Sequence, residues 1–297
     1  MNSSNDISCI EAWTLAVRPK TLPAAVSPVL VGTAAAFADD RFVLLPALAA
    51  IIGALLLQIA VNLANDYFDF KKGIDTPDRL GPVRVTQSGL ISPSGVKTGL
   101  IVTLGLAVVC GLYLIYAAGW PILVIGLASI FAALAYSGGP YPLASHGLGD
   151  LFVFIFFGLV AVCGTYYVQA LKLTWLVVFL AIPAGFLITA ILVVNNLRDI
   201  STDSNAGKNT LAVRLGEKGT RIEYVILLAA SYLIPIFLLL KGILSPWILL
   251  SLLSLPMAFS SIRFICTESG EALNDALAGT AKLAFIFSLL LSVGLII

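Results

Sequence analysis

The sequence predicts an all-α integral membrane protein, in which nine transmembrane helices form a bundle around a central cavity. Hydrophobic residues make up 59% of its 297 residues. The mean hydropathy of +1.02 is far above that of a soluble domain. Apolar runs such as Phe42–Ala64 and Leu151–Ala170 are long enough, or nearly so, to cross a bilayer as helices. We expect one domain over residues 1–297.

Each apolar run is expected to form one helix, and the connections mark where the helices end. The expected spans lie near residues 21–38, 42–65, 96–118, 121–137, 150–170, 174–196, 222–240, 244–264 and 277–297. The connections at one face are short: Ala38–Arg41, Ala118–Pro121, Lys172–Thr174 and Lys241-Gly242. At the other face, two loops near 70–95 and 198–221 are long and polar. Long loops on a compact bundle commonly carry function.

The distribution of lysine and arginine predicts the orientation. With the N-terminus inside, the cytoplasmic segments hold 14 of the 17 basic residues, all except Arg41, Lys172 and Lys241, which is the positive-inside pattern. Residues 1–20 lack a short apolar core followed by a small-residue cleavage site, so we interpret them as part of an uncleaved anchor. We therefore expect a multi-pass protein of the cell's inner, or cytoplasmic, membrane, with its N-terminus and both long loops in the cytoplasm.

Two acidic clusters, Asn65–Asp69 and Asn195–Asp203, end the second and sixth spans and precede the long loops. Charged residues make up only 11% of the chain, and carboxylates at a membrane helix end are costly unless cations offset them, which indicates a functional site. On ideal helices each cluster presents one oxygen-rich face, spanning about 100° and about 80° of arc. Two such faces that met would bind Mg²⁺, our expected cofactor, and the anion it carries. The predicted catalytic residues are Asp66, Asp69, Asp199 and Asp203; these four and Asn65 are predicted metal ligands, with Asp75 as a further candidate.

Basic, amide and aromatic side chains near the clusters are candidate ligands of a diphosphate or an aromatic substrate. They are Asn62, Lys72, Arg84, Tyr136, Asn195, Arg198 and Lys208. A structural alternative treats the clusters as salt bridges and caps, for example Arg198 with Asp199, but it leaves the excess carboxylates unexplained. Tyr136 lies in a turn rich in glycine and aromatic residues, where it would flank a cation or belong to an interfacial aromatic belt. His146, in the same loop, is either an acid or base or simply solvated.

An ion-coupled transporter is the alternative from another class, because transporters also place carboxylates inside helix bundles. Their sites lie near the bilayer midplane, whereas the acids here end their spans. That position favours chemistry on a substrate with a polar head and an apolar tail, which would contact the lipid bilayer. Neither a basic-aromatic surface for nucleic acid nor a paired cysteine spacing is present.

A weak internal repeat relates the two clusters. Asn62-x-x-x-Asp66 and Asn195-x-x-x-Asp199 lie 133 residues apart, and each closes an even-numbered span. The repeat predicts two pseudo-symmetric halves that face each other across the cavity.

The clusters and several loop motifs resemble a known family. The residues are Arg18–Pro23, Asn65-Asp66-x-x-Asp69, Lys72–Asp75, Gly81-Pro82 through Gln87–Gly89, Tyr136–Pro140, Gly147–Asp150, Asn195–Asp199, Asp199-x-x-x-Asp203 and Lys208–Ala212. Together they resemble the UbiA superfamily of intramembrane aromatic prenyltransferases, and most closely its menaquinone branch. One departure is Gly73, where many members carry a third aspartate; Asp75 stands two residues later.

The resemblance implies Mg²⁺-dependent transfer of a polyprenyl group from polyprenyl diphosphate to 1,4-dihydroxy-2-naphthoate, with loss of the carboxyl group, to give a demethylmenaquinone. Another aromatic acceptor, 4-hydroxybenzoate or homogentisate, remains the alternative within the family. Neither the general base nor the prenyl chain length follows from the sequence.

Overall fold

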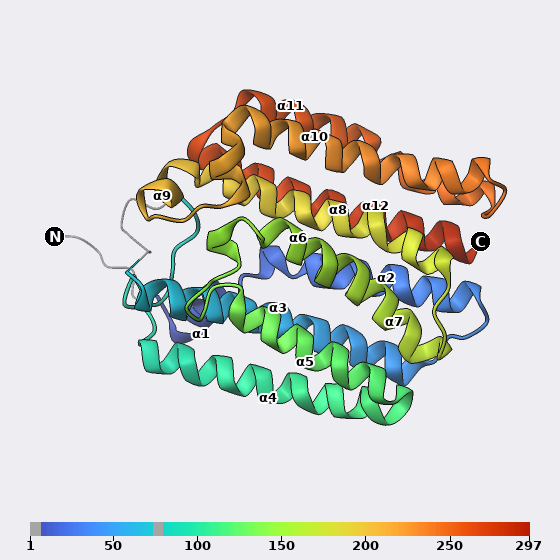
Figure 1. The fold of residues 1–297 in the computed structure, drawn as a ribbon, viewed down its shortest axis with the longest axis horizontal. Helices are drawn as coiled ribbons and strands as arrows, with labels where there is room; N and C mark the ends of the chain where they lie inside the picture. The colour runs from blue at the N-terminus through green and yellow to red at the C-terminus, as the bar shows by residue number, and fades with distance from the viewer. Residues whose placement is uncertain (1–6, 74–79) are drawn as a thin grey trace.

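The computed structural model describes residues 7–73 and 80–297, which form helices and connecting turns and no strand. The long helices lie side by side, roughly along the longest dimension of the molecule (Figure 1). In chain order the helices are α1 (Cys9–Val17), α2 (Pro23–Ala38), α3 (Leu44–Lys71), α4 (Pro93–Ala118), α5 (Trp120–Ala135), α6 (Gly149–Val153), α7 (Ala161–Ala170), α8 (Trp175–Arg198), α9 (Ile200–Asn205), α10 (Leu211–Leu240), α11 (Leu255–Thr267) and α12 (Leu273–Ile296).

The predicted all-α membrane fold is confirmed, but the nine predicted spans are not all distinguished. Within the described ranges, seven helices are long and apolar enough to cross a membrane. One of them is the continuous segment Gly149–Ala170, made of α6, a π-helical stretch (Phe154–Val160) and α7. An eighth is possible if α1 and α2, which meet at a 48° bend, count as one span. α5 is apolar but has only 16 residues, about 24 Å of helix. The full set of nine spans therefore stays a prediction.

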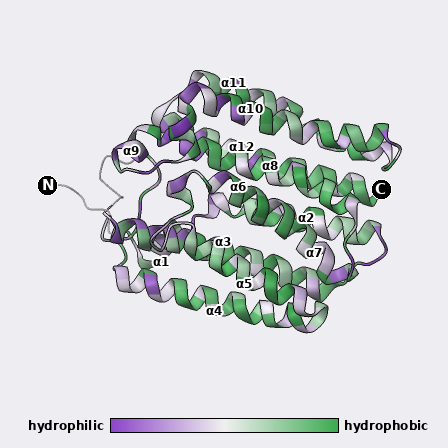
Figure 2. Ribbon diagram, viewed as in Figure 1, coloured by the Kyte–Doolittle hydropathy of each residue, from purple (hydrophilic) through white to green (hydrophobic). Residues whose placement is uncertain are grey.

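The two ends of the bundle differ in chemistry. Hydrophilic residues gather around α9, the N-terminal helix α1 and the C-terminal end of α3, at the left of the view, while apolar residues dominate the middle (Figure 2). At the opposite end, the Asp39 carboxylate accepts a hydrogen bond from Tyr166 Oη at 2.7 Å and pairs with Lys172 Nζ at 2.7 Å. The polar residues therefore lie at the two faces expected to contact water.

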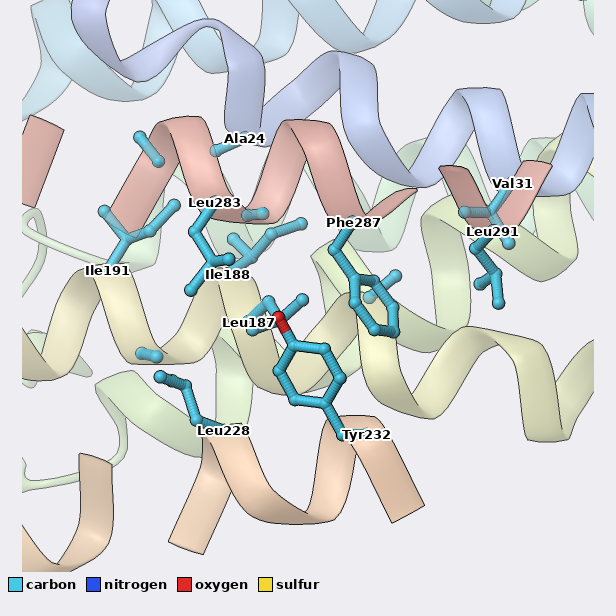
Figure 3. Close-up of a cluster of buried hydrophobic side chains, with 14 of the residues drawn as sticks. Ala24, Val31, Leu187, Ile188, Ile191, Leu228, Tyr232, Leu283, Phe287 and Leu291 are labelled. Carbon is cyan, nitrogen blue, oxygen red and sulfur yellow. The ribbon is translucent and has the colours of Figure 1, made fainter. Parts of the chain in front are cut away.

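α8 is the central helix of the C-terminal half and packs against α10, α12 and the π-helical stretch. Side chains from α2, α8, α10 and α12 form its largest buried cluster, which includes Leu187 and Leu283 (Figure 3). Within the cluster, Tyr232 and Phe287 meet edge to face at 5.1 Å. The Tyr232 hydroxyl is satisfied by Ser254 Oγ at 2.6 Å, which lets a polar group be buried in an apolar environment. This packing holds the middle of α8 within the bundle.

Backbone contacts and caps fix where the helices begin and how closely they approach. A Cβ at Gly158 would lie 2.7 Å from the Cα of Gly185, so only glycine permits this approach of the π-helical stretch to α8. Ser92 caps α4 by accepting the Gly95 N–H at 3.1 Å, and Thr210 caps α10 through the Val213 N–H at 3.2 Å. Both caps close a long polar loop at the same end of the bundle.

Candidate active site

A cavity of about 500 Å³ runs from the polar end of the bundle into its apolar interior. The C-terminal ends of α3 and α8 both line it, so the two acidic clusters meet at one site as the sequence analysis required. Of the predicted site residues, nine line the cavity: Asn62, Asn65, Asp69, Arg84, Tyr136, Asn195, Asp199, Asp203 and Lys208. Asp66, Lys72 and Arg198 are not among the lining residues. Asp75 lies outside the described residues.

Asp69 is the carboxylate on which cations from two loops converge. Its Oδ2 lies 3.4 Å from Arg84 Nη2 and 3.5 Å from Lys208 Nζ. The same Lys208 ammonium lies 3.7 Å from Asp203 Oδ1. Asp69 and Arg84 are both buried, so water screens their interaction little. Lys208 thus joins the first acidic cluster to the second.

Asp66 has a different environment from Asp69, although both residues belong to the first cluster. Its side chain is only 1% exposed. Its two carboxylate oxygens accept hydrogen bonds from the backbone N–H groups of Val85 at 3.3 Å and Thr86 at 3.1 Å. Arg18 Nη2 lies 3.8 Å away. Asp66 therefore fastens the 80–92 loop to α3, and its assignment as a metal ligand stays a prediction.

The second cluster departs from the single helical face that its spacing suggested. α8 ends at Arg198, and Asp203 lies on the separate short helix α9. The chain turns at Asp199, whose φ of −97° and ψ of 8° are not helical. The Asp203 N–H still donates to the Asp199 carbonyl at 2.7 Å. This turn leaves Asn195, Asp199 and Asp203 lining the same cavity.

Arg198 is held by carboxylate and amide oxygens, and its side chain is fully buried. Its Nε and Nη2 donate to the two Asp199 oxygens at 2.8 and 2.6 Å. Nη2 also donates to Asn195 Oδ1 at 2.9 Å, and Nη1 donates to Asn274 Oδ1 at 2.7 Å. The structural alternative of an Arg198–Asp199 pair is thus present, and Arg198 orients Asp199 from behind the cavity wall. A direct contact of Arg198 with substrate stays a prediction.

Asn274 is a residue that the sequence analysis missed. It lies in the first turn of α12, and its amide bonds both Arg198 and the Leu80 carbonyl, the latter at 2.9 Å. No local pattern marks it, because its partners lie 76 and 194 residues away along the chain.

Asn65 and Lys72 both contact Ser137, in the turn after α5. Ser137 Oγ donates to Asn65 Oδ1, and Lys72 Nζ donates to the Ser137 carbonyl at 2.7 Å. Although Lys72 as a whole is exposed, partial burial of its ammonium group lowers its pKa, and nearby Asp69 opposes that shift. Asn62 donates its amide N–H groups to the Val17 carbonyl at 2.9 Å and to Thr21 Oγ1 at 3.1 Å.

His146 does not line the cavity. Its Nδ1 lies 2.7 Å from the Pro142 carbonyl, and its ring stacks on Tyr141 at 3.5 Å. These contacts are those of a loop-stabilising residue.

The donor set at the polar end fits a hard divalent cation. Among the described residues, no three histidine, cysteine or acidic side chains already form a cluster able to hold a metal ion. The carboxylates of Asp69, Asp199 and Asp203 and the amide oxygen of Asn65 nevertheless belong to residues that line the same cavity. Mg²⁺ suits such a site, because it takes one or two carboxylates and completes its octahedron with water and phosphate oxygens.

The internal repeat, which paired Asn62 and Asp66 with Asn195 and Asp199, stays a prediction. Asn62, Asn195 and Asp199 line the cavity, whereas Asp66 does not. Asn65 and Asp69 on α3 have the same four-residue spacing as Asn195 and Asp199 and also line the cavity.

The inner part of the cavity is lined by apolar side chains. Ala50 of α3, Ile115 of α4, Ile122 of α5 and Val168 of α7 line its far end, and the same region forms a small hydrophobic cluster. The cavity thus combines a charged mouth for an anion with an apolar interior for a hydrocarbon chain.

Comparison with known proteins assigns the family. A family model described as the UbiA prenyltransferase family matches residues 25–290. The chain is 41% identical to the 1,4-dihydroxy-2-naphthoate octaprenyltransferase of Escherichia coli (strain K12), over 99% of this chain and 97% of that protein. It is 40% identical to the enzyme of the same name from Mycobacterium tuberculosis (strain ATCC 25618 / H37Rv), over 93% and 94%.

Solved structures share the fold at low sequence identity. A UbiA homolog from Aeropyrum pernix K1 aligns with a TM-score of 0.70 at 16% identity, over 89% of this chain and 94% of that one. A UbiA homolog from Archaeoglobus fulgidus bound to GPP and Mg²⁺ aligns with a TM-score of 0.68 at 16% identity, over 96% and 99%. With a matching family model and relatives of about 40% identity over almost their whole length, this chain belongs to the UbiA prenyltransferase family.

Proposed function

We propose that this protein transfers a polyprenyl group from polyprenyl diphosphate to 1,4-dihydroxy-2-naphthoate in menaquinone biosynthesis. The observation that carries the acceptor is the 41% identity, over nearly the full length, to a 1,4-dihydroxy-2-naphthoate octaprenyltransferase. The carbon–oxygen bond to the diphosphate breaks, and the diphosphate leaves with the bonding electrons. The naphthoate ring supplies the electron pair for the new carbon–carbon bond, and its carboxylate leaves as CO₂ and returns the bonding electrons to the ring, giving the quinol form of a demethylmenaquinone.

The polar end of the cavity is proposed to bind the diphosphate. Asn65, Asp69, Asp199 and Asp203 would hold Mg²⁺, which supplies positive charge that stabilises the leaving diphosphate. An archaeal homolog of the same fold was solved with GPP and Mg²⁺, which supports the assignment.

The cationic and aromatic side chains complete the proposed site. Arg84 and Lys208 line the cavity and both contact Asp69, and Arg18, which lies beside Asp66, also lines it. Arg84 and Lys208 would donate to diphosphate oxygens. Tyr136 would present its ring to the allylic cation and exclude water.

We place the protein in the cytoplasmic membrane, with nine crossings in a single domain over residues 1–297 and the polar end of the cavity facing the cytoplasm. The excess of lysine and arginine in the connections at that end supports this orientation.

The acceptor is tested by offering 1,4-dihydroxy-2-naphthoate, 4-hydroxybenzoate and homogentisate separately, with one prenyl diphosphate and Mg²⁺, to the purified protein. We expect prenylated product and an equal amount of pyrophosphate with the naphthoate, detected by mass spectrometry and a coupled phosphate assay. A product formed only from another acceptor would reassign the substrate. Substrate flux into sealed vesicles without pyrophosphate release would favour a transporter.

The apolar interior is proposed to hold the isoprenoid chain. Four glycines from four helices line it: Gly53 of α3, Gly111 of α4, Gly126 of α5 and Gly164 of α7. A Cβ added at Gly111, Gly126 or Gly164 meets no atom within 4 Å, so larger side chains there have room to enter the cavity.

Gly126→Leu is therefore expected to shorten the chain that the cavity accepts. A substrate that no longer fits an apolar pocket loses about 10- to 200-fold in kcat/KM. We expect such a loss with octaprenyl diphosphate and a smaller one with geranyl diphosphate, measured on the purified variant. Gly105→Leu is the matched control, because Gly105 is exposed on α4, has equal space and does not line the cavity. Equal losses with both chain lengths would contradict the prediction.

A further inference from the structure

The N-terminal turn of α12 lies between the two parts of the diphosphate site. Asn274 in this turn accepts a hydrogen bond from Arg198 Nη1 at 2.7 Å and donates one from Nδ2 to the Leu80 carbonyl at 2.9 Å. One side chain therefore links the C-terminal end of α8 to the beginning of the 80–92 loop. α12 itself contributes only Leu277 to the cavity lining, so Asn274 acts from outside the cavity.

On the α8 side, the Asn274 contact determines how Arg198 is held. The guanidinium is fully buried and donates to both Asp199 oxygens and to Asn195 Oδ1. Asp199 and Asn195 accept from Nε and Nη2 only, and Asn274 provides the acceptor for Nη1. A buried guanidinium that loses such an acceptor must move or recruit water. Because Arg198 grips Asp199 with two hydrogen bonds, a shift of Arg198 moves the Asp199 carboxylate that lines the cavity.

On the loop side, the same amide fixes the position of Arg84. Leu80 lies four residues before Arg84, and the intervening Gly81-Pro82 leads directly into the segment that Asp66 holds. Arg84 reaches Asp69 at 3.4 Å. The loop thus has one anchor on α12, at Leu80, and one on α3, at Val85 and Thr86, and Arg84 directly precedes the second.

We propose that Asn274 is a positioning residue that couples the two halves of the diphosphate site. Its bond to Arg198 positions the Asp199 carboxylate, and its bond to Leu80 positions Arg84 by way of the 80–92 loop. Asn274 thereby sets the position of Asp199 relative to that of Arg84. Only a side chain with both an acceptor and a donor does this, since one partner is a guanidinium and the other is a carbonyl. This inference rests on the proposed function for the identity of the ligand.

The experiment compares Asn274→Ala and Asn274→Asp with the wild type and with Asp275→Asn. Asp275 is the next residue of the same turn and is exposed. Asn274→Ala removes both links, whereas Asn274→Asp keeps an acceptor for Arg198 and removes the donor to Leu80. Prenyl transfer is measured for KM and kcat. Binding of the unreactive farnesyl thiolodiphosphate with Mg²⁺ is measured by calorimetry without acceptor.

We expect both Asn274 variants to raise the KM for prenyl diphosphate and the Kd for the thiolodiphosphate by about tenfold, the size of a lost charged hydrogen bond. The KM for the naphthoate and all Asp275→Asn values should stay within about twofold of wild type. If Asn274→Ala does not accumulate in membranes, Asn274→Asp carries the test.

Other outcomes would overturn the inference. A lower melting temperature with unchanged Kd would reduce Asn274 to a structural role. An unchanged Kd in Asn274→Asp alone would show that the loop link has no effect. Lack of transfer by the wild type to any acceptor would instead refute the proposed function, whereas the binding measurement would still test the coupling.

Discussion

Asp69→Ala is expected to lower prenyl transfer by about 100-fold or more, the scale on which the loss of one preorganised electrostatic contact acts in an active site. Asp69 Oδ2 lies 3.4 Å from Arg84 Nη2 and 3.5 Å from Lys208 Nζ. Asp69 is also a proposed Mg²⁺ ligand. Its loss removes negative charge that holds the metal and leaves two cations close together. The measurement is the Mg²⁺-dependent rate in membranes that contain equal amounts of protein.

Asp199→Ala is expected to have an effect of the same size by another route. It removes the carboxylate that takes two hydrogen bonds from Arg198, at 2.8 and 2.6 Å, and leaves a buried guanidinium without its anion. Asp40→Asn is the control for both variants, because Asp40 is exposed at the opposite end and asparagine tolerates its φ of 53°. Turnover near the wild-type rate in both variants would end the proposed site assignment.

Lys208→Met is expected to make the protein depend on Mg²⁺ for stability. Lys208 lies 3.5 Å from Asp69 and 3.7 Å from Asp203, so it neutralises both clusters. Without it, the two carboxylates lose a shared partner, at a cost of about 1–3 kcal/mol in the free energy of unfolding. Thermal unfolding in detergent should show a lower Tm in EDTA that Mg²⁺ restores.

The activity of Lys208→Met should fall as well, through a KM for prenyl diphosphate raised about tenfold or more, because a cation at the anion site is lost. Lys218→Met is the matched control: Lys218 is exposed on α10 and does not line the cavity. A Tm of Lys208→Met that is the same with EDTA and with Mg²⁺, and equal to that of the control, would contradict the expected role.

The sequence predicted the fold well where hydropathy decides it. Runs such as 42–65 and 174–196 became α3 and α8, because burial in lipid demands helices of this length. The bend between α1 and α2 was not foreseen, since it depends on packing rather than on composition, whereas the expected span 121–137 was already short, as α5 is. The described helices give seven or eight spans, and the sequence predicts nine.

The sequence predicted which types of residue form the site, but not which of their side chains face the cavity. Helical spacing cannot distinguish Asp69, which lines the cavity, from Asp66, whose oxygens are taken by backbone N–H groups of another loop. It also treats 195–203 as one helix, although the chain turns at Asp199. Asn274 was invisible because hydrogen bonds between distant segments leave no local pattern.

The contact between Asp66 and the Val85 and Thr86 amides is made by protein atoms alone. It ties the segment that carries Arg84 to the helix that carries Asp69, so main-chain bonds set how far apart these two side chains stand at the cavity. An inhibitor that mimics the anion can therefore be designed around a guanidinium whose backbone position is defined.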